Sequence, residues 1–348
     1  MSKEVLITGA GGYIGTTLVP MLLMAGYRVR AVDTWWLGQH IPAHPALSII
    51  TADVRETTPE IFADVDAVVD LAALSNDPCG DAFSSATRSI NHHARRRTAE
   101  MARQAGARHY VLASSCSVYG SAKTVLGETS DTRPLTVYAE ANLDAEKDTL
   151  SLATPAFRAT ALRFATLFGV SPRMRLDLVV NGMAYNAWRH GEIAVDGSGA
   201  QMRPLLHVRD AAEAIFRTLK HADRLPMADI LNVGNPQQNI SINDISTGIA
   251  EQLRGICGKA ISIRHRGPQD LRSYVASFNK LHATLAWLPS RAWQPEIARI
   301  VSYLKHASAD DLRSANTLDY YRDMISKGLI DANFATPSRS HEKQDSAG

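Results

Sequence analysis

Residues 4–15 read Glu-Val-Leu-Ile-Thr-Gly-Ala-Gly-Gly-Tyr-Ile-Gly, and this stretch decides the fold. The aliphatic run Val5–Thr8 predicts a buried strand, and the apolar spacing over Tyr13–Met24 predicts a helix. Between them the glycines let the backbone turn tightly, while the start of the helix presents free N–H donors and a partial positive charge. Such turns also join strands to helices for steric reasons alone. The pattern predicts a phosphate-binding turn formed by Gly9, Gly12, Tyr13, Ile14 and Gly15.

Beyond this turn, the first half of the chain alternates short β-branched runs with longer amphipathic segments. Further strands are expected at Arg28–Val32, Leu47–Thr51, Ala67–Leu71, His109–Ala113, Thr160–Phe164 and Ile230–Val233. Further helices are expected at Ser84–Ala105, Val137–Leu152 and His207–Leu219. This rhythm is typical of βαβ units, so it predicts an α/β fold: a Rossmann-like, doubly wound parallel sheet with a smaller C-terminal cap.

The rhythm breaks after Phe168, where a long segment rich in glycine intervenes. We therefore expect residues 1–168, completed by 207–234, to form a dinucleotide-binding domain. Residues 169–206 and 235–334 are expected to form a substrate-binding cap. Residues 335–348 are polar and almost devoid of large apolar side chains, which predicts a disordered tail.

Composition limits the partners. The 348 residues are 45% apolar and 21% charged with a formal net charge of +2, and the basic residues are scattered, so we expect neither nucleic acid nor membrane as a partner. The three cysteines lack the spacing of a zinc site or a disulfide scaffold, and the histidines lack ligand spacing, so we expect reduced thiols and no metal. The sequence shows neither an export signal nor an apolar run near the roughly 20 residues of a membrane span. These features favour a cytoplasmic protein that binds small molecules.

Asp33 closes the second expected strand, the usual place for a ribose-binding acid. A carboxylate there accepts both hydroxyls of an adenosine ribose and repels a 2′-phosphate, which favours NAD(H) over NADP(H). Asp53 and Val54, after the third strand, are further candidates for contact with the adenine, although an Asp that ends a strand is often a turn former.

Further marks recur in order along the chain. They are Leu71-Ala72-Ala73 after the fourth strand, Asn91 in the next helix, Ser114 and Ser115 after the fifth strand, and Tyr138 beyond. Together with the glycine spacing, they make the chain similar to the extended short-chain dehydrogenase/reductase family, especially its nucleotide-sugar epimerases and dehydratases. The resemblance implies that NAD is held by the glycine turn and by Leu71, Ala72, Ala73, Asn91, Ser114, Tyr138 and Asn142. It also implies a nucleoside-diphosphate sugar in the cleft and a homodimer paired through the helices near Ser84 and Val137.

The same resemblance implies catalysis by a Ser or Thr, a Tyr, and a Lys four residues after the Tyr. Ser115 and Tyr138 occupy the first two positions, but Asn142 stands at the third. The spacing of four keeps Asn142 on the helix face of Tyr138, within reach of the ribose, yet Asn142 brings no charge. A cation about 5 Å away at an effective dielectric constant near 20 is worth ~3 kcal/mol, so we expect Tyr138 to be a weaker base than its family counterpart. Asn142→Lys is then expected to raise activity at neutral pH.

This substitution leaves three interpretations open. Tyr138 still serves as acid and base, the neighbouring Cys116 thiol takes the proton instead, or the chain binds its ligands without catalysis. The family's 4,6-dehydratases place Asp and Glu directly after the position of Ser115, where this chain has Cys116 and Ser117, so dehydration is disfavoured. We therefore expect an epimerase that oxidises a sugar hydroxyl transiently to a ketone. The alternatives are an NADH-dependent keto-sugar reductase or dehydratase, and a non-catalytic binding protein.

Candidate substrate contacts lie beyond the strand ends. Ser75 and Asn76 follow the Ala72-Ala73 turn and are expected to face the sugar. Arg203 and Arg272 fall where the family places arginines on a diphosphate, a role that suits the guanidinium fork. Further candidates are Ser117, Thr166, Arg173 and Asn181. By contrast, adjacent helical residues point in different directions, so the run Arg95-Arg96-Arg97 is expected to be solvated and without common function.

Overall fold

The computed structural model describes residues 3–258, 260–268 and 270–337, and a parallel sheet forms its centre. Within these ranges the sheet has seven strands in the order β3-β2-β1-β4-β5-β7-β11, and every neighbouring pair is parallel. The strands are β1 (Glu4–Thr8), β2 (Arg28–Asp33), β3 (Leu47–Thr51), β4 (Ala67–Asp70), β5 (His109–Ser115), β7 (Arg158–Phe164) and β11 (Ala228–Val233). The chain reverses its direction of travel across the sheet between β1 and β4, and such a switch point is where open α/β sheets bind ligands.

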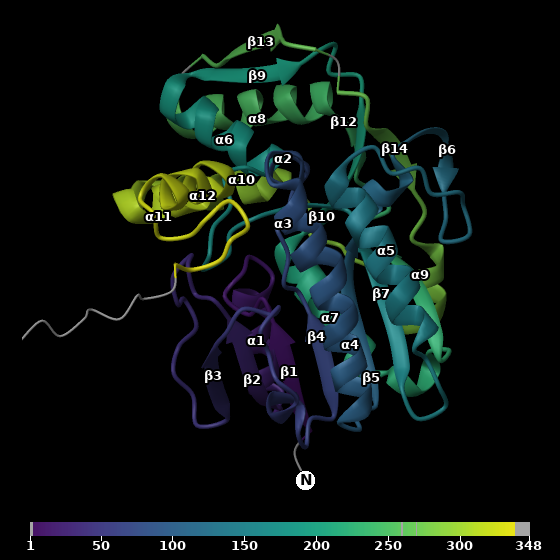
Figure 1. Ribbon diagram of the computed structural model, residues 1–348. Helices are drawn as coiled ribbons and strands as arrows, with labels where there is room; N and C mark the ends of the chain where they lie inside the picture. The colour runs from purple at the N-terminus through teal and green to yellow at the C-terminus, as the bar shows by residue number, and fades with distance from the viewer. Residues whose placement is uncertain (1–2, 259, 269, 338–348) are drawn as a thin grey trace, which may run out of the picture.

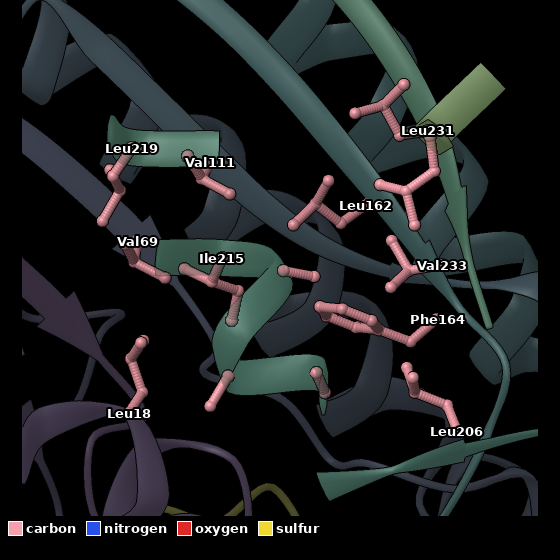
Figure 2. Packing of buried hydrophobic residues seen from close by; sticks show 14 of the residues in the cluster. Leu18, Val69, Val111, Leu162, Phe164, Leu206, Ile215, Leu219, Leu231 and Val233 are labelled. Carbon is pink, nitrogen blue, oxygen red and sulfur yellow. The ribbon is translucent and has the colours of Figure 1, made fainter. Parts of the chain in front are cut away.

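Side chains alternate along the strands and so build a separate core on each face of the sheet. Val5 and Ile7 pack with α1 (Gly15–Met24) and α7 (Val208–Lys220), whereas Leu6 packs on the opposite side with α4 (Arg95–Gln104) and α5 (Val137–Ser151). Figure 2 shows the first of these cores, with Ile215 and Leu219 of α7 among aliphatic side chains from the strands. Burial of both faces explains why the inner strands β1 and β4 read as nearly continuous apolar runs.

The other face carries a helical layer that is less regular than the sequence suggests. In place of one helix over Ser84–Ala105, the chain forms α3 (Ser84–Arg88), a π-helical segment η2 (Ser89–Ala94) and then α4. This series lies beside α5 in front of the sheet (Figure 1). Short helices also occur as η1 (Pro59–Phe62), α2 (Asp77–Ala82), η3 (Cys116–Tyr119) and η4 (Ala222–Arg224).

The cap lies above the carboxyl ends of the strands (Figure 1). Its small sheets are β8 (Thr166–Phe168) with β10 (Met202–His207) and β12 (Asn239–Ser241), and β9 (Glu192–Asp196) with β13 (Ser262–Arg266). Its helices are α6 (Val179–His190), α8 (Ile242–Cys257), α10 (Gln294–His306), α11 (Ala309–Ala315) and α12 (Thr317–Ser326). Helices α6, α8 and α10 share one apolar core, which gives the cap its own rigid frame.

Two segments connect the cap with the seven-stranded sheet. Strand β6 (Ser121–Leu126), which is not expected from the sequence, pairs with β14 (Ser273–Ala276), and α9 (Asn279–Leu285) packs back onto the core of the main sheet. The segment after β10 likewise returns to the sheet as α7 and β11.

The expected fold class, a Rossmann-like doubly wound sheet with a smaller cap, is confirmed. The domain boundaries drawn from the sequence stay a prediction. Of the expected tail, residues 338–348 lie outside the described residues, and Ala335 still bonds to Asp331. In the described ranges, no helix is both long and apolar enough to cross a bilayer.

Candidate active site

A deep cavity opens between the carboxyl ends of the strands and the cap. Its walls include the glycine turn, the ends of β2, β4 and β5, the start of α5, and residues of the cap. Most of the predicted site residues line it: Gly9, Gly12, Tyr13, Ile14, Gly15, Asp33, Asp53, Val54, Leu71, Ala72, Ala73, Ser75, Asn76, Ser114, Ser115, Ser117, Tyr138, Thr166, Arg173, Arg203 and Arg272. The topology thus brings together residues that lie more than 260 positions apart in the chain, from Gly9 to Arg272.

The backbone conformation and the close contacts of the turn require glycine at position 9. Gly9 has φ +67°, and a Cβ on it would lie 2.6 Å from the backbone nitrogen of Ala72. Helix α1 begins directly after this turn, so its N-terminus points into the cavity. Tyr13 donates from its hydroxyl to the carbonyl of Gly169, which fixes the turn against the chain that enters the cap. The arrangement fits the pyrophosphate of a dinucleotide.

Asp33 stands at the end of β2 and holds the neighbouring loop. Its Oδ2 accepts from the Gly11 N–H at 2.9 Å, and its Oδ1 accepts from the Trp35 N–H at 2.9 Å. Burial raises the pKa of this carboxyl, although these backbone hydrogen bonds oppose the rise. A carboxylate has about four lone-pair sites, so Asp33 keeps acceptor capacity for ribose hydroxyls. Asp53 also lines the cavity, but Arg55 binds its carboxylate in a salt bridge of 2.5 Å.

Ser115 and Tyr138 form the reactive corner of the cavity. Ser115 ends β5, and its Oγ accepts from the Ser117 N–H at 3.1 Å. Thr136 caps α5, its Oγ1 accepting from the Ala139 N–H at 3.2 Å, and so places Tyr138 in the first helical turn. Burial raises the pKa of the Tyr138 phenol, Asp77 adds to the rise, and the guanidinium groups of Arg95 and Arg175 and a hydrogen bond with Ser115 oppose it. A phenol and a hydroxyl in contact are suited to pass a proton to or from a bound alcohol.

Four predicted residues lie behind the wall rather than on it. Asn142 is 1% exposed, and its amide donates to the Tyr138 carbonyl at 2.8 Å. Cys116 is fully buried, its thiol donates to the Arg163 carbonyl, and burial raises its pKa. Asn91 and Asn181 hold backbone groups of Leu74 and of Gly169 and Arg175 respectively. The structure therefore gives Cys116 no path to a substrate and gives Asn91 and Asn181 supporting positions.

Two arginine–carboxylate pairs, Arg175–Asp177 and Arg203–Asp270, line the cavity. Arg175 binds Asp177 through two hydrogen bonds of 2.9 Å and donates to the Ser75 carbonyl at 3.0 Å. Asn76 donates to the same Asp177 carboxylate at 2.6 Å. Although burial alone would raise it, Arg175 holds the pKa of the Asp177 carboxyl below its usual value. Ser75 and Asn76 thus line the cavity, held by an ion pair that the sequence did not predict, and their contact with a sugar stays a prediction.

The second group of charges lies nearer the cap. Arg203 binds Asp270 at 2.6 Å, and Arg272 contacts both Asp270 and Asp77. The guanidinium of Arg203 also lies 5.9 Å from the ring centre of Tyr274, which lines the cavity. Both predicted diphosphate arginines therefore face the cavity, each paired with a carboxylate of the chain.

The burial of Arg95 is the largest difference between the structure and the sequence-based prediction. The expectation that the run Arg95-Arg96-Arg97 is solvated is right for Arg96, which is exposed, but wrong for Arg95, which is 2% exposed and lines the cavity. The period of a regular helix gives no hint of this, because the π-helical segment before Arg95 shifts the register. In the part of the chain that the structure describes, no group of three or more His, Cys, Asp or Glu is placed to hold a metal.

Comparison with known proteins agrees with this geometry. Residues 5–234 match the family model described as the NAD dependent epimerase/dehydratase family. UDP-glucuronic acid decarboxylase 1 of Xenopus tropicalis is 26% identical over 317 residues, which cover 87% of this chain and 72% of that relative. A putative UDP-glucose 4-epimerase of Methanocaldococcus jannaschii is 24% identical over 316 residues, which cover 87% of this chain and 98% of that relative.

A similar protein of known structure has been solved with NAD bound. MoeE5 in complex with UDP-glucose and NAD aligns with a TM-score of 0.76 at 27% identity, covering 87% of this chain and 98% of that one. The glycine turn, the helix N-terminus and Asp33 fit NAD by their chemistry, and the family description names the same molecule. NAD is the cofactor of this cavity.

Proposed function

The chain belongs to the NAD dependent epimerase/dehydratase family, and on that premise we propose that it is a nucleotide-sugar epimerase. It acts by transient oxidation of a sugar hydroxyl to a ketone. The observation that carries the proposal is that Ser115 and Tyr138 line the same cavity as Asp33 and the glycine turn.

Tyr138 and Ser115 share the chemistry at the sugar hydroxyl. Tyr138 takes the proton of this hydroxyl, and Ser115 donates a hydrogen bond to the oxygen on which negative charge develops. When bound, NAD supplies the acceptor for the hydride of the same carbon. Once the sugar has turned its other face to the cofactor, Tyr138 returns its proton to the oxygen while the hydride that NAD would hold returns to the carbon. Return of the hydride to the opposite face inverts that carbon.

The residues after Ser115 favour inversion over loss of water. Elimination across a sugar needs an acid and a base beside the oxidised carbon. Cys116 is buried against the Arg163 carbonyl, and Ser117, which lines the cavity, carries a hydroxyl that is too weak an acid for this role. The position that a dehydratase fills with carboxyl groups therefore offers none here.

We assign the diphosphate of the substrate to Arg203 and Arg272. Guanidinium forks match phosphate oxygens, and both side chains line the cavity on its cap side. Each is bound to Asp270 before substrate enters, so the substrate diphosphate competes with a carboxylate. We assign contacts with the sugar to Ser75, Asn76 and Thr166, which line the same cavity.

The relatives named UDP-glucuronic acid decarboxylases favour a second candidate, oxidative decarboxylation. That reaction begins with the same oxidation. A ketone at the position β to a sugar carboxylate then makes loss of carbon dioxide easy, because the electron pair of the broken bond passes to the ketone as an enolate.

One experiment separates these reactions. The purified protein is denatured and the released nucleotide is identified, and the intact protein is incubated with UDP-, GDP-, dTDP- and CDP-sugars, including UDP-glucuronic acid, in deuterated water. Bound NAD with an inverted sugar by NMR supports the epimerase, whereas release of carbon dioxide supports the decarboxylase. An empty site that consumes added NADH with a keto-sugar indicates a reductase. Binding without turnover of any sugar overturns catalysis and leaves a binding protein.

We further propose that the protein works in the cytoplasm as a homodimer. The helical layer of α3, α4 and α5 forms one outer face of the molecule (Figure 1), and family resemblance assigns the pairing to these helices. Light scattering of the purified chain measures the mass; a monomer at micromolar concentration contradicts the dimer.

A further inference from the structure

A buried guanidinium from another helix lies where Tyr138 lacks a lysine on its own helix. Arg95 Nη1 donates to Asn142 Oδ1 over 2.9 Å, and Asn142 Nδ2 donates to the Tyr138 carbonyl over 2.8 Å. Asn142 therefore bridges Arg95 to the first turn of α5. Arg95 lines the cavity, whereas Asn142 lies behind it.

Backbone carbonyls fix the guanidinium in this place. Arg95 Nε donates to the Ala72 carbonyl at 2.9 Å, and Nη1 also donates to the Ala113 carbonyl at 3.0 Å. The π-helical segment Ser89–Ala94 precedes Arg95 directly, and its wider turn changes the helical register of Arg95. Nη2 donates to none of the described residues, so this N–H group is available to the contents of the cavity.

Other charges around Tyr138 are already paired. Asp77 of α2 faces Tyr138 but contacts Arg272. Arg175, from the loop after β8, also faces Tyr138 but is bound to Asp177 at 2.9 Å. Ser115 of β5 meets the phenol as a neutral hydrogen-bond partner. Cys79 of α2 is buried beside Arg175, and burial raises its pKa, so it stays neutral.

Arg95 is the cation near Tyr138 that is least neutralised. Its nearest carboxylate is Asp70, and Arg95 Nε lies 3.9 Å from Asp70 Oδ1. The two oxygens of Asp70 already accept hydrogen bonds from the hydroxyls of Thr8 and Tyr110. At 3.9 Å and without a direct hydrogen bond, Asp70 offsets the charge of Arg95 less closely than Asp177, at 2.9 Å, offsets that of Arg175.

We propose that Arg95 and Asn142 together replace the lysine: Arg95 supplies the charge that stabilises the Tyr138 phenolate, and Asn142 positions that charge. The assignment rests on the proposed function, since it takes Tyr138 as the proton acceptor. Burial, the largest influence, and Asp77 both raise the pKa of Tyr138, and Arg95 opposes them, which agrees in sign. Arg95 is thus a positioning and charge-supplying residue for the base.

The test measures the pH at which the phenol at position 138 loses its proton, in the absence of substrate. A fluorinated tyrosine, whose phenol is more acidic than that of tyrosine, is placed at 138 in the NAD-loaded protein and titrated by fluorine NMR. Arg95→Met is expected to move the midpoint to higher pH by about one pH unit, and Asn142→Lys in the same chain to move it back. Asp70→Asn is expected to move the midpoint to lower pH, because it removes the charge that offsets Arg95.

Arg97→Met is the matched control. Arg97 belongs to the same helix but donates to the carbonyls of Arg55 and Thr57, away from the cavity, so its loss is expected to leave the midpoint in place. A purely structural role for Arg95 lowers the melting temperature of Arg95→Met without moving the midpoint, and that result overturns the proposal. If Arg95→Met does not fold, an unmoved midpoint in Asp70→Asn overturns it equally. Because no sugar is present, failure of the proposed reaction leaves this measurement intact.

Discussion

Asp33 Oδ2 accepts a hydrogen bond of 2.9 Å from the backbone N–H of Gly11, so the acid at the end of β2 is tied to the glycine turn. The same carboxylate therefore shapes the glycine turn and lines the cavity, where we expect it to bind the ribose of NAD. We expect Asp33→Asn to weaken NAD binding by about 10- to 100-fold, since a charged hydrogen-bond acceptor is worth about 1.5–3 kcal/mol. The preference for NAD over NADP is expected to fall as well, because the repulsion of a 2′-phosphate is lost. Calorimetry with both cofactors checks this, with Asp66→Asn, a change at a half-buried carboxylate paired with Arg108 outside the cavity, as the control.

Gly9 has φ +67° and leaves no room for a Cβ beside Ala72. Gly9→Ala is expected to lower the free energy of unfolding by at least about 2 kcal/mol, since the left-handed conformation alone costs an L-residue about 1–2 kcal/mol and the clash adds to it. NAD binding is expected to be lost. Gly26→Ala is the control, because Gly26 has φ +84° but no atom within 4 Å of the added Cβ. Equal losses of stability in the two variants, measured by urea unfolding, contradict the role of the contact.

Tyr138 lies in the first turn of α5 and lines the cavity together with Ser115. Tyr138→Phe keeps the ring and removes the proton acceptor, so we expect kcat to fall by about 10²- to 10⁴-fold with little change in NAD affinity. Burial raises the pKa of the phenol, so the rate of sugar oxidation by the parent protein is expected to rise toward alkaline pH. Tyr320→Phe, which loses only a hydroxyl bonded to the Trp36 carbonyl, serves as the control. A pH profile unchanged by Tyr138→Phe would assign the proton to another group.

Most of the residues predicted for the site line the cavity because their sequence signals are local. The run Val5–Thr8, the glycines after it and Asp33 lie within one βαβ unit, and parallel strands place the loops after their carboxyl ends at one edge of the sheet. Arg95 and Arg175 escape prediction for a different reason. Arg95 is buried because of the π-helical register before it, and Arg175 is buried with Asp177 as its ion-pair partner. Neither feature produces a periodic pattern in the sequence. The strand β6 is missed because its partner, β14, lies far along the chain.

The presence of Arg95 changes what a lysine at 142 should do. From the sequence alone, Asn142→Lys is expected to raise activity at neutral pH. In the structure the new ammonium would lie beside the Arg95 guanidinium, which is 2.9 Å from Asn142 Oδ1, and two buried like charges repel. We now expect Asn142→Lys alone to lower the melting temperature and to leave kcat/KM no higher than in the parent. Arg95→Met combined with Asn142→Lys is expected to recover both, and a gain in kcat/KM from Asn142→Lys alone would contradict this.

His109 makes stability depend on pH far from the active site. Its ring is 4% exposed in β5, with Nε2 3.0 Å from Thr160 Oγ1. Burial, with a smaller effect of Arg158, lowers the pKa of His109 from 6.5 to about 4. Between these values the unfolded chain binds a proton that the folded chain does not, so the unfolded state gains as the pH falls. This histidine is therefore expected to cost up to about 3 kcal/mol of stability as the pH falls from about 6.5 to about 4.

His109→Gln keeps a hydrogen-bonding group near Thr160 and removes the titration. We expect urea unfolding of this variant to show a shallower loss of free energy from about pH 6.5 to about pH 4 than the parent, by up to about 1.4 kcal/mol per pH unit. His282→Gln, a change at an exposed histidine, is expected to leave the slope as it is. Parallel curves for the parent and His109→Gln would mean that the folded protein accommodates the charged imidazole in the sheet, since only a buried neutral ring produces the difference in slope.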